Sequence, residues 1–265
     1  MKSLKSIFAV LLSLGMAFTI VSCGDDDDAN TPDPNNVEGT GKLTIHFENY
    51  FDATAGIDIE LDEVYTTSSG DSITVSSIRY WISNFILFNG NDTAYQDEDG
   101  YYLVEKTADN TREMIVFDEV PSGTYTRLQF ALGVDPANND TLGSGKGELS
   151  LSNGMFWAWN TGYKFLRLDG TYYEGDSSNY QPLRIHTGLN AYYIKKEIPL
   201  SANLVVTEGG DHIAHFMVSV KNMFEQPNAI QLGEKDGIWM FFTEEPAWNR
   251  MNENISNMFM FHHAE

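Results

Sequence analysis

Cysteine and positive charge are both scarce in this sequence. Cys23 is the only cysteine among 265 residues, so no intrachain disulfide can form and the fold must depend on its own core. The 16 Lys and Arg residues are opposed by 38 Asp and Glu residues, which gives a net charge of −22 at pH 7. Nucleic-acid binding needs Lys and Arg to neutralise phosphates, so this composition argues against a nucleic-acid partner.

The common signatures of enzymes are also missing. The sequence contains no Cys-x-x-Cys, no His-Glu-x-x-His, no phosphate-binding glycine loop and no Gly-x-Ser-x-Gly elbow. Ser, His and Asp are present without a local arrangement that singles out a triad. The 38 acidic residues offer too many possible carboxylate pairs for one of them to be assigned to glycoside hydrolysis. We therefore expect that the protein is not an enzyme.

The first residues have the pattern of a secretory signal. Lys2 and Lys5 precede an apolar stretch that ends at Ile20-Val21-Ser22-Cys23, which matches a bacterial lipobox. The stretch is shorter than the roughly 18 residues that a stable membrane span needs. We expect residues 1–22 to be a signal peptide and Cys23 to be acylated, which would anchor the protein to the outer membrane at the cell surface or the periplasmic face.

A polar segment follows the predicted lipidation site. Residues 23–40 include the run Asp25-Asp26-Asp27-Asp28 and contain almost no apolar side chains, as expected of a disordered tether. The acidic run resembles the surface-export signal of Bacteroidetes-type lipoproteins, and a plain solvated spacer is the alternative. Cleavage after residue 22 would remove two lysines and no acid, which takes the net charge from −22 to −24. Such a charge disfavours contact with anionic lipid head groups.

Residues 41–265 have the pattern of one β domain. Leu43-Thr44-Ile45-His46-Phe47 alternates apolar and polar residues, as a half-buried strand does. Turn signals such as Asp99-Gly100 and Asp169-Gly170 separate further runs of this kind. Such runs occupy residues 76–83, 101–104, 114–117, 125–132, 164–168, 191–194, 202–206 and 213–220. We expect an all-β, sandwich-like fold of antiparallel sheets, with short helices near residues 222–224 and 247–260.

Two tryptophans lie close together in the most distinctive segment, Gly154 to Phe165. In a strand Trp157 and Trp159 would face the same side, about 6.6 Å apart along the chain. Two adjacent indoles form either part of a core or the wall of a binding site, and the sequence leaves both interpretations open.

The six histidines are candidate metal ligands, although none has a ligand spacing that is specific by itself. His46 lies on the polar side of its predicted strand, and His186 lies where a strand ends at a glycine. His212 and His215 would face opposite sides of a strand, and the pair at 262–263 lies near a chain end, where disorder is common. The lack of thiolates argues against a structural zinc site, whereas imidazole remains a good ligand for copper.

An ordered set of segments resembles the MbnP-like family, named after a copper-binding protein encoded with methanobactin. The resemblance runs from Leu43 to the C-terminus. Its parts are Leu43 to Phe47, Ile78 to Phe85, Pro121 to Tyr125, Phe130 to Asp135, Gly154 to Phe165 and His186-Thr187-Gly188.

The resemblance implies a periplasmic or surface copper-binding protein with His46 and His186 as ligands. It also implies that Trp157 or Trp159 is oxidised to kynurenine by a partner di-haem enzyme. Such a site requires distant strands to bring both imidazoles together beside the indoles.

A surface carbohydrate- or ligand-binding module without metal is the alternative function. Five Trp, thirteen Tyr and sixteen Phe residues could supply platforms that stack on sugar rings, although aromatic residues also fill cores. An open groove lined by Trp157 and Trp159 without histidine would favour sugar, and burial of the indoles beside His46 and His186 would favour metal. An extracellular hydrolase is a third possibility that no constellation of residues supports.

Overall fold

The computed structural model describes residues 39–265 except 143–144, 160–161 and 174–178. The chain divides into two units, Met1–Asn36 and Val37–Glu265, and all described residues belong to the second. The predicted signal peptide, Cys23 and nearly all of the predicted tether therefore lie outside the described residues. Within the described part, no helix has the length and apolar character needed to cross a membrane.

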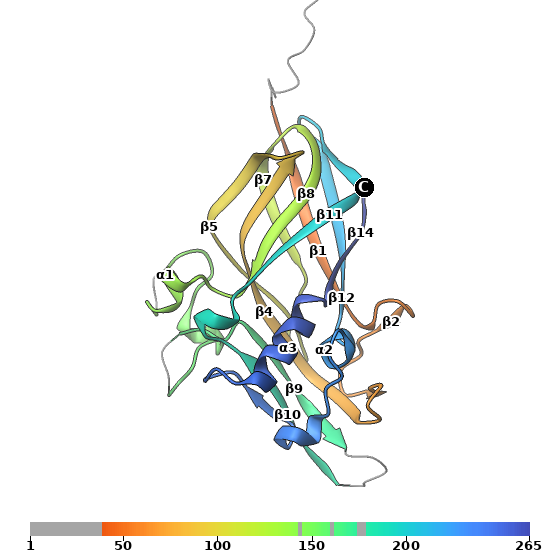
Figure 1. The fold of residues 1–265 in the computed structure, drawn as a ribbon. Helices are drawn as coiled ribbons and strands as arrows, with labels where there is room; N and C mark the ends of the chain where they lie inside the picture. Colours follow the sequence, from red (N-terminus) through yellow and green to blue (C-terminus); the bar gives the residue numbers. More distant parts are fainter. Residues whose placement is uncertain (1–38, 143–144, 160–161, 174–178) are drawn as a thin grey trace, which may run out of the picture. The chain divides into compact units, whose positions relative to one another are not determined.

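The described residues form two β-sheets, which confirms the prediction of an all-β fold (Figure 1). The first sheet has five strands in the order β14-β12-β1-β2, and β7 also pairs with β1. Its strands are β1 (Thr40–Asp52), β2 (Ile57–Asp58), β7 (Met114–Pro121), β12 (Asp211–Ser219) and β14 (Phe259–Ala264).

The second sheet has nine strands, with the central order β11-β8-β4-β9-β10-β13. Strands β3 and β5 pair with β4, and β6 pairs with β5. The strands are β3 (Val64–Thr66), β4 (Ser72–Asn89), β5 (Asp92–Thr107), β6 (Thr111–Arg112), β8 (Gly123–Leu132), β9 (Leu166–Tyr173), β10 (Tyr180–Thr187), β11 (Ile194–Val206) and β13 (Ile238–Met240).

Two strand pairs depart from the predicted antiparallel arrangement. β1 pairs in parallel with β12, from Lys42 opposite Asp211 to Tyr50 opposite Ser219, and β10 pairs in parallel with β13. Parallel neighbours need a long crossover connection, and here almost the whole second sheet lies between β1 and β12 in the sequence. Local alternation cannot reveal such a pairing, so the sheets are mixed rather than purely antiparallel.

Alternate residues of β1 pack into a core that the two sheets share. Leu43, Ile45 and Phe47 are completely buried, and Phe47 packs edge-on against Tyr80 of β4 and Phe130 of β8. Because successive side chains of a strand point to opposite faces, the residues between these apolar ones point away from the core. The outer face of the first sheet therefore carries the polar residues of β1.

The helices are short and lie mainly in the C-terminal third, as predicted. They are α1 (Pro136–Asn139), α2 (Asn222–Glu225) and α3 (Pro246–Ser256), with 3-10 turns η1 (Leu151–Asn153), η2 (Asn190–Tyr192) and η3 (Leu232–Lys235). The last helix ends earlier than expected, because β14 follows it and pairs with β12. The histidine pair at 262–263, expected at a disordered end, belongs to this strand.

Candidate metal centre

Two histidines from distant parts of the chain lie side by side on the outer face of the first sheet. His46 of β1 is the direct parallel neighbour of His215 of β12. Their ring centroids are 5.3 Å apart, with an angle of 61° between the ring planes. The sequence pattern placed His46 on the polar side of its strand, and the β1–β12 pairing brings His215 to the same level.

A glutamate completes this group. Glu48 lies two residues after His46 on the same face of β1, and its Oε1 atom is 2.9 Å from His215 Nδ1 and 3.3 Å from His46 Nδ1. The three side chains offer ligand atoms that all lie within 4.8 Å of one another. Burial acts to raise the pKa of Glu48, but the hydrogen bond from His215 and the attraction of both imidazoles outweigh it and lower that pKa.

Two imidazole nitrogens of this group lie near carboxylates without forming a hydrogen bond. His46 Nδ1 and His215 Nε2 are buried and make no hydrogen bond. A buried polar atom without a partner is costly, and a metal ion is one way to satisfy it. Two such nitrogens beside a carboxylate fit a bound cation.

Potential ligands continue along the same row of the sheet. Met114 of β7 lies opposite His46, and His263 of β14 lies opposite His215. The His215 and His263 rings stack with centroids 4.3 Å apart and an angle of 3°. Glu265 Oε1 lies 3.6 Å from His215 Nε2. We call Met114, His46, His215 and His263, taken across β7, β1, β12 and β14, the first row.

Two more thioethers lie at the level of Glu48, two residues further along β1 than His46. Met217 of β12 lies opposite Glu48, and Met260 of β14 lies opposite Met217. Imidazole nitrogen and thioether sulfur both suit copper, and thioethers favour its reduced form. The donor set on this face therefore fits copper better than a hard cation that prefers oxygen ligands.

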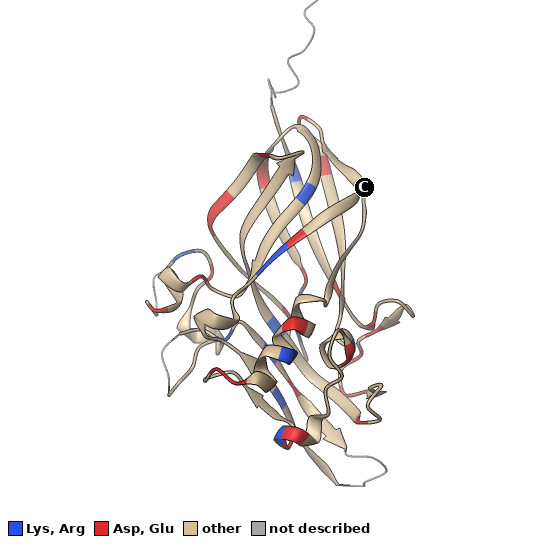
Figure 2. Cartoon of the chain, viewed as in Figure 1, with Lys and Arg blue, Asp and Glu red and all other residues tan. Residues whose placement is uncertain are grey.

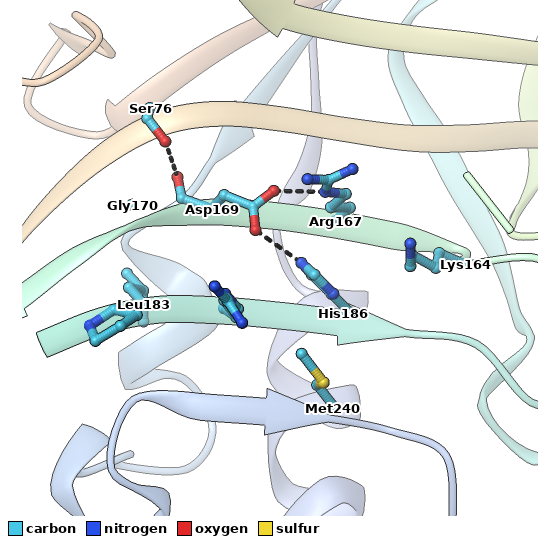
Figure 3. Close-up of a pocket in the computed structure, with 10 residues that line it drawn as sticks. Ser76, Lys164, Arg167, Asp169, Gly170, Leu183, His186 and Met240 are labelled. Atoms are coloured by element: carbon cyan, nitrogen blue, oxygen red, sulfur yellow. Dashed lines mark hydrogen bonds and ion pairs between the residues drawn. The ribbon is translucent and has the colours of Figure 1, made fainter. Parts of the chain in front are cut away.

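His186, the second predicted ligand, lies in the second sheet. Its Nε2 atom donates a hydrogen bond to Asp169 Oδ1 at 2.9 Å, and the residue is 6 % exposed (Figure 3). Burial lowers the pKa of His186, although Asp169 acts in the opposite direction. Burial acts to raise the pKa of Asp169, but the hydrogen bond and charge of His186, together with Arg167, outweigh it and lower that pKa to about 2.

The two predicted tryptophans contact each other but have different surroundings. Their ring centroids are 5.4 Å apart, and Trp157 is 3 % exposed whereas Trp159 is 62 % exposed. Trp157 lies 6.2 Å from the His186 ring. It also packs against Gly188, where an added Cβ would stand 2.6 Å from the indole Nε1. One indole thus belongs to the interior and the other to the surface, which fits the core interpretation for Trp157 and leaves a binding role of Trp159 as a prediction.

The structure does not bring His46 and His186 together. Ile45 and Ile185, their neighbours in sequence, are both buried in the shared core, so the two histidines point away from it on different sheets. Among the described residues, no ring contact, ion pair or hydrogen bond joins His46 to His186 or to either tryptophan. The alternation that directs each imidazole outward also separates them. Their roles in copper binding remain predictions.

Sequence reasoning missed the partners of His46. Spacing groups His215 with His212, but His212 Nε2 instead accepts a hydrogen bond from the Thr207 backbone at 3.0 Å. The position of His263 near the chain end suggests disorder, but Phe259 and Phe261 at alternate positions are a signal for a strand.

One comparison with known proteins confirms the resemblance seen in the sequence. The family model described as MbnP matches residues 40–241. A solved structure, MbnP from Methylosinus trichosporium, is similar with 14 % sequence identity and a TM-score of 0.43, over 72 % of this chain and 79 % of that one. No curated protein matches. Because the family model covers most of the chain, this protein belongs to the MbnP family.

Proposed function

We propose that this protein is an exported, lipid-anchored copper-binding protein, not an enzyme, and that it acquires, stores or delivers copper. The observation that carries the proposal is the group of His46, Glu48 and His215, with two buried imidazole nitrogens that make no hydrogen bond. Membership of the MbnP family supports copper as the metal, and the neighbouring thioethers of the first sheet agree with that choice. The lipobox at Cys23 supports export and anchoring.

His46 and His215 would be the principal ligands. Glu48 holds both imidazoles through its carboxylate and could bind the metal or orient its ligands. Met114 and His263 flank the pair, so either could add a ligand. When bound, copper would supply redox capacity, and the role of these residues is to hold and orient it.

Titration of the copper-free protein with Cu(I) in the presence of a competing chelator tests this assignment. We expect His46→Ala/His215→Ala to weaken copper binding by at least about 100-fold, because replacing outer partners alone typically costs 10–100-fold. His212→Ala is the matched control, since His212 lies on the same strand and outside the group. Equal affinity in the wild type and the double variant would reject the site.

A kynurenine site next to His186 is a separate part of the proposal. A partner di-haem enzyme would reach Trp159 more easily than Trp157, because Trp159 is 62 % exposed. Mass spectrometry of the native protein tests this. Oxidation at Trp159, with copper affinity sensitive to His186→Ala, would support a family-type site there. Unmodified masses for both tryptophans would remove the kynurenine proposal and leave the His46 site untouched.

One observation favours the carbohydrate-binding alternative. Trp159 packs edge-on against Phe242, with ring centroids 5.0 Å apart, and both side chains are exposed. An exposed aromatic pair can stack on a sugar ring. Polysaccharide binding that is lost in Trp159→Ala and kept in His46→Ala/His215→Ala would favour this function.

A further inference from the structure

Positive charge gathers in one pocket of this acidic protein. The pocket of about 490 Å³ lies over β9 and β10, and its walls include Lys164, Arg167 and Arg184 but only one acidic residue, Asp169 (Figure 3). In the whole chain acidic residues outnumber basic ones, 38 to 16, and they are spread over many elements (Figure 2). The balance of charge inside the pocket is therefore opposite to that of the protein.

The strand register explains how these groups meet. Arg167 of β9 lies opposite Arg79 of β4 on one side and His186 of β10 on the other. Met240 of β13 lies opposite His186 and ends the series, which we call the second row. In the neighbouring register position, Arg184 lies opposite Asp169.

Part of this positive charge lacks a counter-charge. Asp169 pairs with Arg167 at 2.5 Å, and Arg79 lies 3.3 Å from Glu105. No ion pair among the described residues involves Lys164 or Arg184. The exposed Arg184 side chain is therefore free to meet a ligand.

Lys164 is held at the pocket in a constrained position. Its Nζ donates a hydrogen bond to the Gly154 carbonyl at 3.2 Å and lies 5.4 Å from the centre of the Trp157 ring. Burial lowers the pKa of Lys164, and the charges of Arg167 and Arg79 lower it further, while Asp169 opposes them. An anion placed beside Lys164 would relieve this repulsion between like charges.

We propose that this pocket binds a small organic molecule that carries a phosphate or carboxylate group, with the unpaired Arg184 guanidinium meeting the oxyanion and with Arg167 and Lys164 adding positive charge along the pocket. Guanidinium groups recognise such oxyanions through paired hydrogen bonds, and an ammonium adds a point charge. The volume lies in the range of small-molecule sites. Pro182 and Met240 supply apolar walls for the carbon part of the ligand. The pocket shares no residue with the group of His46, Glu48 and His215, whereas His186, which lines it, belongs to the proposed kynurenine site.

Calorimetric titration of the copper-free full chain at low ionic strength tests the proposal, with inorganic phosphate and succinate as separate probes. We expect saturable binding of at least one probe, at least about tenfold weaker in Lys164→Met/Arg184→Gln and weakened by added salt. Tighter binding of phosphate would identify a phosphorylated ligand, and tighter binding of succinate would identify a carboxylate.

Lys146→Met/Arg250→Gln is the matched control. It removes the same charges from positions that already pair with Asp99 and Glu234 outside the pocket. If the pocket double variant does not fold, Arg184→Gln alone serves, because the Arg184 side chain is exposed. Binding that is equal in wild type and pocket variants, or no binding of either probe, would overturn the proposal.

Discussion

The outer faces of the two sheets arrange different side chains in the same way. Each carries a row of side chains from four adjacent strands, Met114–His46–His215–His263 in the first sheet and Arg79–Arg167–His186–Met240 in the second. Both rows contain imidazole and thioether groups. In the first row imidazoles are neighbours, whereas in the second the histidine adjoins a guanidinium.

Charge decides which ligand each row can accept. A cation beside imidazole repels a metal ion and attracts an anion, and a carboxylate beside imidazole does the reverse. Glu48 lies against two imidazoles, whereas Asp169 is shared between His186 and Arg167. Histidine on a sheet is therefore a weak indicator of metal binding until its cross-strand neighbours are known.

The largest effect is expected when a guanidinium is placed beside an imidazole in the first row, as in the second row. In His46→Arg a guanidinium would stand beside His215, where it cannot coordinate copper and would repel it. We expect copper affinity to fall at least about 100-fold, or about 2.7 kcal/mol. Competitive Cu(I) titration measures this, with His212→Arg as the control for added charge. Retention of wild-type affinity would contradict the assignment of His46.

The stability of the fold at low pH tests the role of Asp52, the last residue of β1 in the first sheet. Asp52 accepts a hydrogen bond from Lys221 Nζ at 2.8 Å and others from Thr54 and the backbone of Ala55, and these lower its pKa from 3.8 to about 2. A lowered pKa stabilises the fold above about pH 4, and this contribution is lost as the pH falls through about 2.

We therefore expect Asp52→Asn to reduce the free energy of unfolding at pH 7 by about 1–3 kcal/mol. The difference from the wild type should shrink as the pH falls from about 4 towards 2. Denaturant unfolding at a series of pH values measures it. A difference that stays constant across this range would show that the loss has another cause than the charge of Asp52.

The edge of the first row should contribute less than its centre. His263 stacks on His215 but is exposed, so its removal leaves the central pair in place. We expect His263→Ala to weaken copper binding by up to about tenfold, or about 1.4 kcal/mol. The same Cu(I) competition assay measures this, and His262→Ala tests whether the neighbouring imidazole substitutes for it. A loss as large as that of the central double variant would make His263 a principal ligand.

The smallest expected effect concerns anion binding at the second row. Asp169→Asn removes the one carboxylate of the pocket, so its positive charge is less opposed. We expect phosphate or succinate to bind about threefold more tightly, which calorimetric titration would detect. Weaker binding in this variant would mean that Asp169 orients Arg167 for the ligand.

The sequence predicted most of the strands and the outward direction of His46, because alternation is a local property of residues 43–47. The predicted turns Asp99-Gly100 and Asp169-Gly170 were wrong, since they lie inside β5 and β9, and the first half of the predicted strand at 191–194 belongs to the 3-10 turn η2.

The sequence also predicted the position of His186 at the end of a strand. The sequence did not predict that His215 lies beside His46, because the parallel pairing of β1 with β12 has no local signature. The predicted meeting of His46 and His186 required knowledge of which sheet each strand joins, and that depends on packing between distant segments.

The parallel pairing of β1 with β12 has a consequence for when the proposed copper site can form. Glu48 and His215, which hydrogen-bond to each other, are 167 residues apart. During synthesis or secretion β1 emerges early, and it cannot pair with β12 until most of the chain has emerged. If the chain is secreted unfolded, the ligand pair exists only after secretion is complete. The protein would then be unable to sequester copper on the wrong side of the membrane.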